Sequence, residues 1–114
     1  MILMGQIDSA SKQLSKISDT FEGGRISFFN IAWSKLTYPS EVRQDKKFGN
    51  VYFTVTVDTN GIIKDIKIVK SFDDRVNPTV INALRATEGK WKVKIKDGSK
   101  EEYTVMERFY FCIK

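Results

Sequence analysis

Alternating apolar and polar residues in the middle of the chain predict two β-strands joined by a tight turn. Between residues 49 and 57 every second side chain is apolar and falls on one face of a strand: Val51, Phe53, Val55 and Val57. Asp58-Thr59-Asn60-Gly61 follows, and Asn-Gly is a strong hairpin signal. In the second strand, over residues 62–70, Ile66 and Ile68 share a face with Ile62, whereas Ile63 lies on the opposite face. We therefore predict an antiparallel hairpin with Phe53 buried in the core.

Apolar residues spaced three and four apart predict helices before this hairpin. The first 22 residues carry such a seam, typical of an amphipathic helix, at Leu3, Ile7, Ala10, Leu14, Ile17 and Phe21. Gly23-Gly24 ends that helix. A second helix follows, and its inner face is predicted to carry Phe29, Ala32, Trp33 and Leu36. It ends before Tyr38, because Pro39 disfavours helical geometry in the preceding residue and suits the first turn of a short helix to about residue 47.

The second half of the chain predicts one more helix and a long final strand. Asn77-Pro78 offers an N-cap and a first-turn proline to a helix whose inner stripe is Val80, Ala83, Leu84 and Thr87. In residues 90–96, lysines alternate with Trp91, Val93 and Ile95, which we place on one face, and the turn Asp97-Gly98 follows. The last strand, over residues 103–113, has an apolar face that only Glu107 interrupts: Tyr103, Val105, Phe109, Phe111 and Ile113.

This order of elements predicts an α+β fold, in which a three-stranded antiparallel sheet packs with helices and is preceded by an N-terminal amphipathic helix. With 114 residues, the chain suits a single small core. We assign residues 1–22 to the N-terminal helix and residues 23–114 to the domain. No apolar run approaches the length of a membrane span, and the opening apolar residues are too few for a signal-peptide core, so we expect any export signal or anchor to lie upstream.

Charge and residue content narrow the chemistry. Nineteen basic and 14 acidic side chains give a net charge of +5, which attracts anionic partners without choosing among them. Without histidine, and with Cys112 as the sole cysteine, the chain lacks the residues for Ser-His-Asp or Cys-His catalysis and for histidine or thiolate metal sites. Adjacent carboxylates at 73–74 and 101–102 diverge in extended backbone. We predict no enzymatic activity, no cofactor, no metal, and a buried, inert thiol at Cys112.

The alternating lysines of residues 90–96 have two interpretations. A basic strip beside Trp91 would bind the phosphates of a nucleic acid. The alternative is a solvated strand face whose lysines prevent aggregation of strand edges. We favour the second, because an RNA-binding sheet exposes aromatic residues on the basic face itself and Trp91 alternates away from it. Nucleic acid is therefore not the expected partner.

An ordered set of short motifs resembles the C-terminal domain of TonB energy-transducer proteins. It begins with Gly23-Gly24, an apolar helix and Leu36-Thr37-Tyr38-Pro39, followed by the strand from Gly49 and the Asn60-Gly61 turn. Further matches are Lys90-Trp91-Lys92, Asp97-Gly98 and Phe109. The sequence departs from the family at Val93, where proline is usual, and at Lys35-Leu36, where well-known members have glutamine and proline.

The resemblance implies a periplasmic, non-enzymatic module that captures an extended segment of an outer-membrane receptor, the TonB box, by strand addition. It implies partner contacts at Tyr38, Pro39, Tyr103, Val105, Phe109 and Phe111. The same strand edge offers a route to a homodimer. If the N–H of Val105 is the group offered to the partner, proline at this position abolishes binding.

Two other functions remain open beside this one. The first alternative is a stand-alone interaction domain of the same fold in another envelope complex. The second, less favoured, is a small basic nucleic-acid-binding domain. The role of Tyr38 is equally open, because an amphipathic tyrosine fits a half-buried position at the core edge as well as it fits a partner contact.

Overall fold

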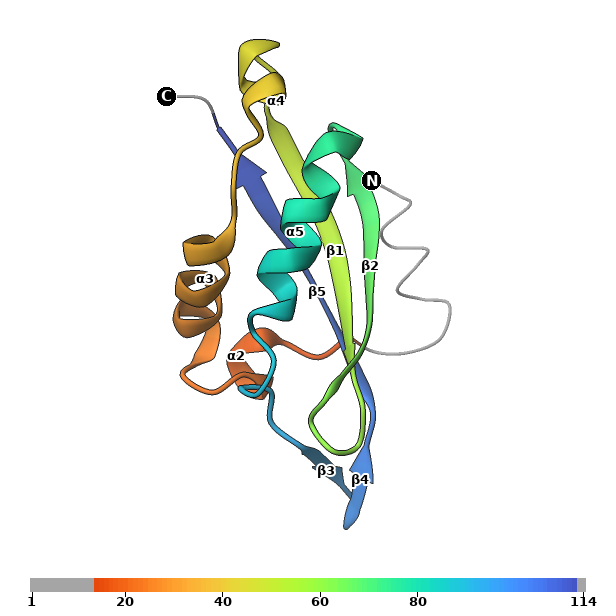
Figure 1. Ribbon diagram of the computed structural model, residues 1–114. Helices are drawn as coiled ribbons and strands as arrows, with labels where there is room; N and C mark the ends of the chain where they lie inside the picture. The colour runs from red at the N-terminus through yellow and green to blue at the C-terminus, as the bar shows by residue number, and fades with distance from the viewer. Residues whose placement is uncertain (1–13, 113–114) are drawn as a thin grey trace.

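The computed structural model describes residues 14–112, which form an α+β fold. The main sheet is antiparallel and has the strand order β2–β1–β5, from β1 (Gly49–Val57), β2 (Ile63–Ser71) and β5 (Tyr103–Phe111). Helices α3 (Gly24–Lys35) and α5 (Asn77–Arg85) lie side by side against one face of this sheet (Figure 1). The predicted three-stranded α+β fold is confirmed.

Short elements connect these parts of the structure. They are α2 (Ile17–Thr20), α4 (Ser40–Gln44), the 3₁₀ turn η1 (Asp74–Val76), β3 (Lys94–Lys96) and β4 (Ser99–Glu101). Strands β3 and β4 form a separate hairpin that projects from one end of the molecule (Figure 1). Trp91 is buried, but Val93 and Ile95 are exposed, so the prediction that these three side chains share one face is wrong. The chain leaves the core after Trp91, and only the last three residues of the lysine row form a strand.

The β1–β2 hairpin forms as predicted, with one difference in its register. The register shifts between Thr56 and Val57, so that Ile63 pairs with Val57 while Ile66 pairs with Val55. A β-bulge of this kind adds one residue to a strand and reverses the faces beyond it. Ile63 is therefore buried with the core residues and Ile62 is exposed, the reverse of the predicted arrangement.

The predicted core is confirmed in the sheet and in α5, and corrected in α3. The apolar face of β1, including Phe53, is buried, as is the α5 stripe that Thr87 completes. In α3, Phe28 is buried together with Phe29 and Ala32, whereas the side chain of Trp33 is 55% exposed. The inner face of α3 is thus turned toward Phe28 rather than Trp33.

The N-terminal helix prediction covers residues 1–22, of which residues 1–13 lie outside the described part. Within residues 14–22 the helix is limited to the single turn α2, flanked by extended backbone at Lys16 and Phe21. The prediction of a continuous helix through Lys16 and Phe21 is therefore wrong. The division at residue 22 remains a prediction, and Phe21, just before it, is buried in the core. No helix in residues 14–112 is long and apolar enough to span a bilayer.

Phe53 provides a direct test of this core. Its side chain is fully buried, so Phe53→Ala is expected to lower the free energy of unfolding by roughly 3–5 kcal/mol in denaturant melts. Phe48→Ala makes the same chemical change at a side chain that is 59% exposed, and its effect should stay within about 0.5 kcal/mol. Equal losses in the two variants would contradict the assigned core.

Candidate partner-binding site

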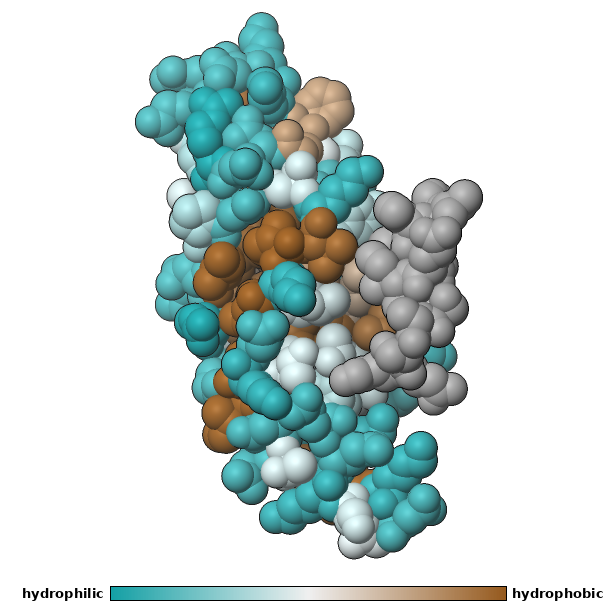
Figure 2. Space-filling view, turned by 90° about the vertical axis from the view of Figure 1, so that its right-hand side faces the viewer, coloured by the Kyte–Doolittle hydropathy of each residue, from teal (hydrophilic) through white to brown (hydrophobic). Residues whose placement is uncertain are grey.

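The two outer edges of the sheet differ in regularity. Strand β2 has two register shifts against β1 and exposes Lys64, Lys67 and Lys70. Figure 2 looks onto this side and shows apolar surface in the middle of the molecule between hydrophilic ends. Strand β5 pairs with β1 from Tyr103 to Phe111 without any shift. Bulges and lysines are common devices that prevent further strand pairing, so β5 is the edge better suited to accept another strand.

The even-numbered residues of β5 direct their backbone groups away from the sheet. The Thr104 carbonyl accepts a hydrogen bond of 2.8 Å from the Ser15 N–H, outside the β1–β5 pair. Thr104 therefore forms a non-hydrogen-bonded pair with Thr56, whose hydroxyl lies 2.9 Å from the Thr104 hydroxyl. Because the two pair types alternate in an antiparallel ladder, Met106, Arg108 and Tyr110 also direct their N–H and C=O groups outward.

This alternation changes what the predicted residues of the last strand can contribute. The side chains of Tyr103, Val105, Phe109 and Phe111 are buried in the core, and their backbone groups point toward β1. The N–H of Val105 therefore faces β1, so the condition set for the proline prediction at Val105 is not met, and proline there would break the β1 ladder instead. Sequence reasoning selected the apolar face of this strand and missed Arg108 and Tyr110, although the same alternation marks them.

Part of this edge is occupied by the chain itself. Ser15 forms a parallel bridge to Val105, and its hydroxyl accepts a 3.1 Å hydrogen bond from Lys94 Nζ. The chain then turns away from the sheet into α2. Beyond the bridge, Arg108 and Tyr110 form the section of β5 that this contact leaves open, and within it the Arg108 N–H donates a long hydrogen bond of 3.4 Å to the carboxylate of Glu107.

Tyr38 and Pro39 lie beside the end of β5. The Tyr38 ring packs edge-on against Phe111, with ring centroids 5.3 Å apart, and the Tyr38 hydroxyl donates a hydrogen bond to the Lys47 carbonyl. Partial burial raises the pKa of Tyr38 above its ordinary value. Pro39 is the N-cap residue of α4. Tyr38 thus fixes the connection between α3 and β1 while leaving part of its ring at the surface.

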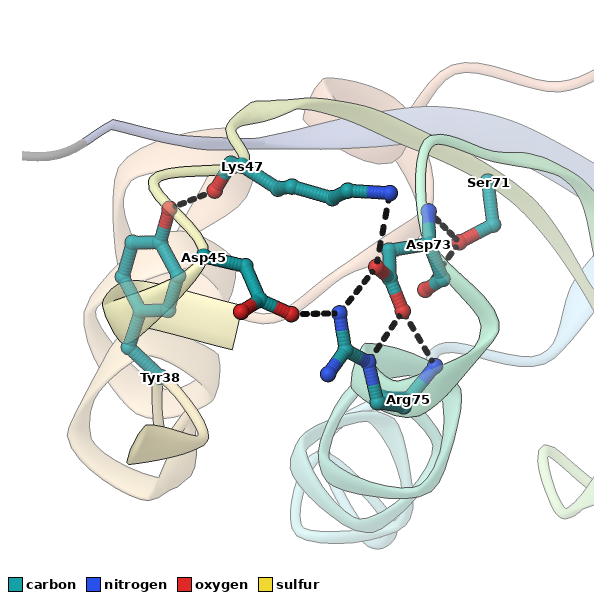
Figure 3. A network of polar contacts seen from close by, with 6 residues as sticks. All are labelled: Tyr38, Asp45, Lys47, Ser71, Asp73 and Arg75. Atoms are coloured by element: carbon teal, nitrogen blue, oxygen red, sulfur yellow. Dashed lines mark hydrogen bonds and ion pairs between the residues drawn. The ribbon is translucent and has the colours of Figure 1, made fainter. Parts of the chain in front are cut away.

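A network of charges holds this connection to the segment that directly follows β2 (Figure 3). Arg75 donates to Asp73 at 2.8 Å and to Asp45, next to α4, at 2.9 Å. The hydrogen bonds from Arg75 hold the pKa of Asp73 well below its usual range. Asp73 also accepts from the Arg75 N–H at 2.9 Å, and so caps η1. Asn77 is the first residue of α5 and does not act as its N-cap, because η1 leads directly into the helix.

A contact with α3 explains why the charged side chain of Glu107 lies on the otherwise apolar face of β5. Its carboxylate accepts hydrogen bonds from Arg25 Nε at 2.8 Å and from Arg25 Nη2 at 3.1 Å. These bonds raise the pKa of Arg25 above its ordinary value. The charge at position 107 thus joins the first turn of α3 to the open edge of the sheet.

Two further predictions concern the thiol of Cys112 and the binding of metal ions. Cys112 is exposed, so the prediction of a buried thiol is wrong, because this residue follows the last pair of β5 and falls on its even-numbered side. Within residues 14–112, no three His, Cys, Asp or Glu side chains are grouped as ligands for a metal ion.

Comparison with known proteins identifies the family. Residues 34–113 match the family model described as the C-terminal domain of the Gram-negative bacterial TonB protein. The chain belongs to this family. A search of curated protein sequences finds no match.

Solved structures of TonB C-terminal domains share the fold. The solution structure of the Helicobacter pylori domain has a TM-score of 0.64 and 22% identity, over 78% of this chain and 79% of the other. The Pseudomonas aeruginosa domain gives a TM-score of 0.52 and 22% identity, over 68% of this chain and 78% of the other. Family and fold together define this TonB-like chain as a member of a family of non-enzymatic interaction domains of the cell envelope.

Tyr103 is predicted to make folding sensitive to alkali. Its hydroxyl donates to the Lys92 carbonyl at 2.7 Å, and burial raises the pKa of Tyr103 to about 12. An unfolded tyrosine ionises near pH 10, so the unfolded state binds fewer protons above that pH and stability falls between about pH 10 and pH 12. In urea melts, the stability advantage of the native chain over Tyr103→Phe should shrink through this window. Parallel pH profiles would contradict the buried, protonated hydroxyl.

Removing the Tyr38 hydroxyl tests its role in the connection between α3 and β1. Tyr38→Phe leaves the Lys47 carbonyl without this donor and is expected to cost about 1 kcal/mol of unfolding free energy. Tyr110→Phe removes the hydroxyl of an exposed ring and serves as the control, with an effect within about 0.5 kcal/mol. A Tyr38→Phe effect as small as that of the control would show that the hydroxyl only meets solvent.

Proposed function

We propose that this TonB-like chain is a periplasmic binding module that captures an extended segment of an outer-membrane receptor by strand addition to the outer edge of β5. The family supports an envelope protein as partner. The observation that carries the proposal is the regular, outward-facing backbone of Arg108 and Tyr110 at the unbulged edge of the sheet. Main-chain hydrogen bonds supply affinity in this type of recognition.

The partner-binding residues of this proposal are Tyr38 and Pro39 together with the backbone of β5. Tyr38 lies against Phe111 at the end of the strand where Arg108 and Tyr110 are open. The buried side chains of β5 hold the strand in place and contribute to binding only through that support. A second copy of the chain could use the same edge, so self-association would compete with receptor capture.

The structure gives less support to a nucleic-acid partner. Trp91 is buried and unavailable for stacking on bases, although stacking is central to single-strand binding. Two lysines of the basic row form ion pairs, Lys90 with Glu22 at 3.2 Å and Lys94 with Glu101 at 3.9 Å. An envelope protein other than a receptor is the alternative partner that the family leaves open.

Nuclear magnetic resonance titration tests the site directly. N-terminal peptides of TonB-dependent receptors from the source organism are added to isotope-labelled protein, and the amide signals of Arg108 and Tyr110 are expected to shift. Arg108→Pro removes one outward N–H and, with the amide signal of Tyr110 as the readout, should abolish the shift, whereas Arg108→Ala keeps the N–H and should retain it. Unchanged spectra at saturating peptide, or shifts confined to residues 90–96 on adding an oligonucleotide, would contradict the proposal.

A further inference from the structure

A groove runs along the open edge of β5, between this strand and α3. Its volume is about 370 Å³, and it is lined by Arg25, Ile26, Phe29, Asn30, Trp33, Arg108 and Tyr110. Three of these side chains are large, apolar or aromatic, and exposed: Ile26 is 77% exposed, Trp33 55% and Tyr110 52%. Exposed apolar side chains gathered in a groove commonly mark a binding surface.

The helix wall of this groove lies before the segment that the family model matches. The family match begins at residue 34, whereas Arg25, Ile26, Phe29 and Trp33 all precede it. The wall is held in place from beneath, because Phe29 packs edge-on against Phe109 of β5 with ring centroids 5.8 Å apart. Ile26 and Trp33 are therefore presented at a fixed distance from the strand edge.

The two arginines in the groove differ in whether a carboxylate pairs with the guanidinium group. Arg25 pairs with Glu107 at 2.8 Å and lies 4.7 Å from the Phe29 ring centroid. Arg108 donates a 2.8 Å hydrogen bond to the neutral Asn50 side chain and forms no ion pair with any residue in 14–112. The groove thus carries one positive charge that lacks a carboxylate, on the side of the strand away from α3.

Arg108 and Tyr110, whose backbone groups point away from β1, both line this groove. A strand added there would send successive side chains to opposite faces of the sheet. One set would lie against Ile26 and Trp33 of α3, and the other set beside Arg108. Two side chains that use both walls must therefore be an odd number of residues apart.

We propose that this groove selects partner segments in which a large apolar residue and an acidic residue are adjacent, or otherwise separated by an odd spacing. The apolar side chain lies against Ile26 and Trp33, and the carboxylate pairs with Arg108. This selection rests on the proposed strand addition at β5 and adds a sequence rule to it. It makes α3 the specificity element of the site.

Matched synthetic peptides test the rule. The parent is acetyl-Ser-Thr-Leu-Glu-Val-Thr-Ser-amide, in which Leu and Val share one face and Glu lies on the other. One variant peptide replaces Leu and Val by Ser, a second replaces Glu by Gln, and a third exchanges Glu with the C-terminal Ser so that Glu lies an even number of residues from both Leu and Val. Dissociation constants come from amide shifts of Arg108 and Tyr110, and the fluorescence of the exposed Trp33 indole reports burial in the groove.

The parent peptide is expected to bind roughly tenfold more tightly than the peptide without apolar residues. This factor is on the order of the binding free energy gained by partly burying one apolar side chain. Ile26→Ser should remove this preference, and Ile95→Ser, which makes the same change at another exposed isoleucine, on β3, should preserve it. Arg108→Gln should remove the preference for Glu over Gln and for the odd spacing, whereas Arg85→Gln on α5 should preserve both. Ile26, Arg108 and both control residues are exposed, so the variants are expected to fold.

The outcomes separate the two proposals. Equal binding of all four peptides, with shifts at Arg108 and Tyr110, would overturn the selection rule and leave strand addition standing. Absence of shifts at these amides with every peptide would overturn both. Shifts that grow with protein concentration without peptide would assign the groove to a second copy of the chain and overturn the rule.

Discussion

The aromatic packing around Phe28 is the interaction on which the position of α3 beside the outer edge of β5 depends. Phe28 is fully buried and lies within 5.1–6.3 Å, between ring centroids, of Phe21, Phe29, Phe53, Trp91 and Phe109. These rings come from the N-terminal segment, α3, β1, β5 and the exit from α5. Because one side chain contacts all of them, the position of α3 beside β5 is set by the same contacts that close the core.

The contrast between the two sheet edges follows from this arrangement. Strand β5 pairs with β1 without a register shift, and core packing buries its odd-numbered side chains except Glu107, so its even-numbered backbone groups form a regular outer row. Strand β2 instead has two register shifts and a series of lysines. A small sheet thus has one edge that resists pairing and one that favours it, which suits a module of a family that acts through protein contacts.

Much of the fold could be predicted because local pattern and tertiary structure agree. The alternation in β1, the Asn-Gly turn and the α5 stripe each occur as the sequence indicates. The failures lie where tertiary contacts decide. A bulge reversed Ile62 and Ile63, the core turned α3 toward Phe28, and backbone pairing replaced helix at Ser15. The Tyr-Pro motif lies beside the end of β5, where Tyr38 packs against Phe111, but the outward direction of the Arg108 and Tyr110 backbone could be obtained only from the register.

Amide hydrogen exchange along β5 tests the central claim most directly, because it reports each backbone N–H separately. The account predicts an alternation, with slow exchange at Glu107 and Phe109, whose N–H groups face β1, and fast exchange at Arg108 and Tyr110. Saturation with a receptor peptide should slow Arg108 and Tyr110 and leave the other two unchanged. Uniform protection along the strand without a partner, or fast exchange at Arg108 and Tyr110 in the complex, would contradict strand addition at this edge.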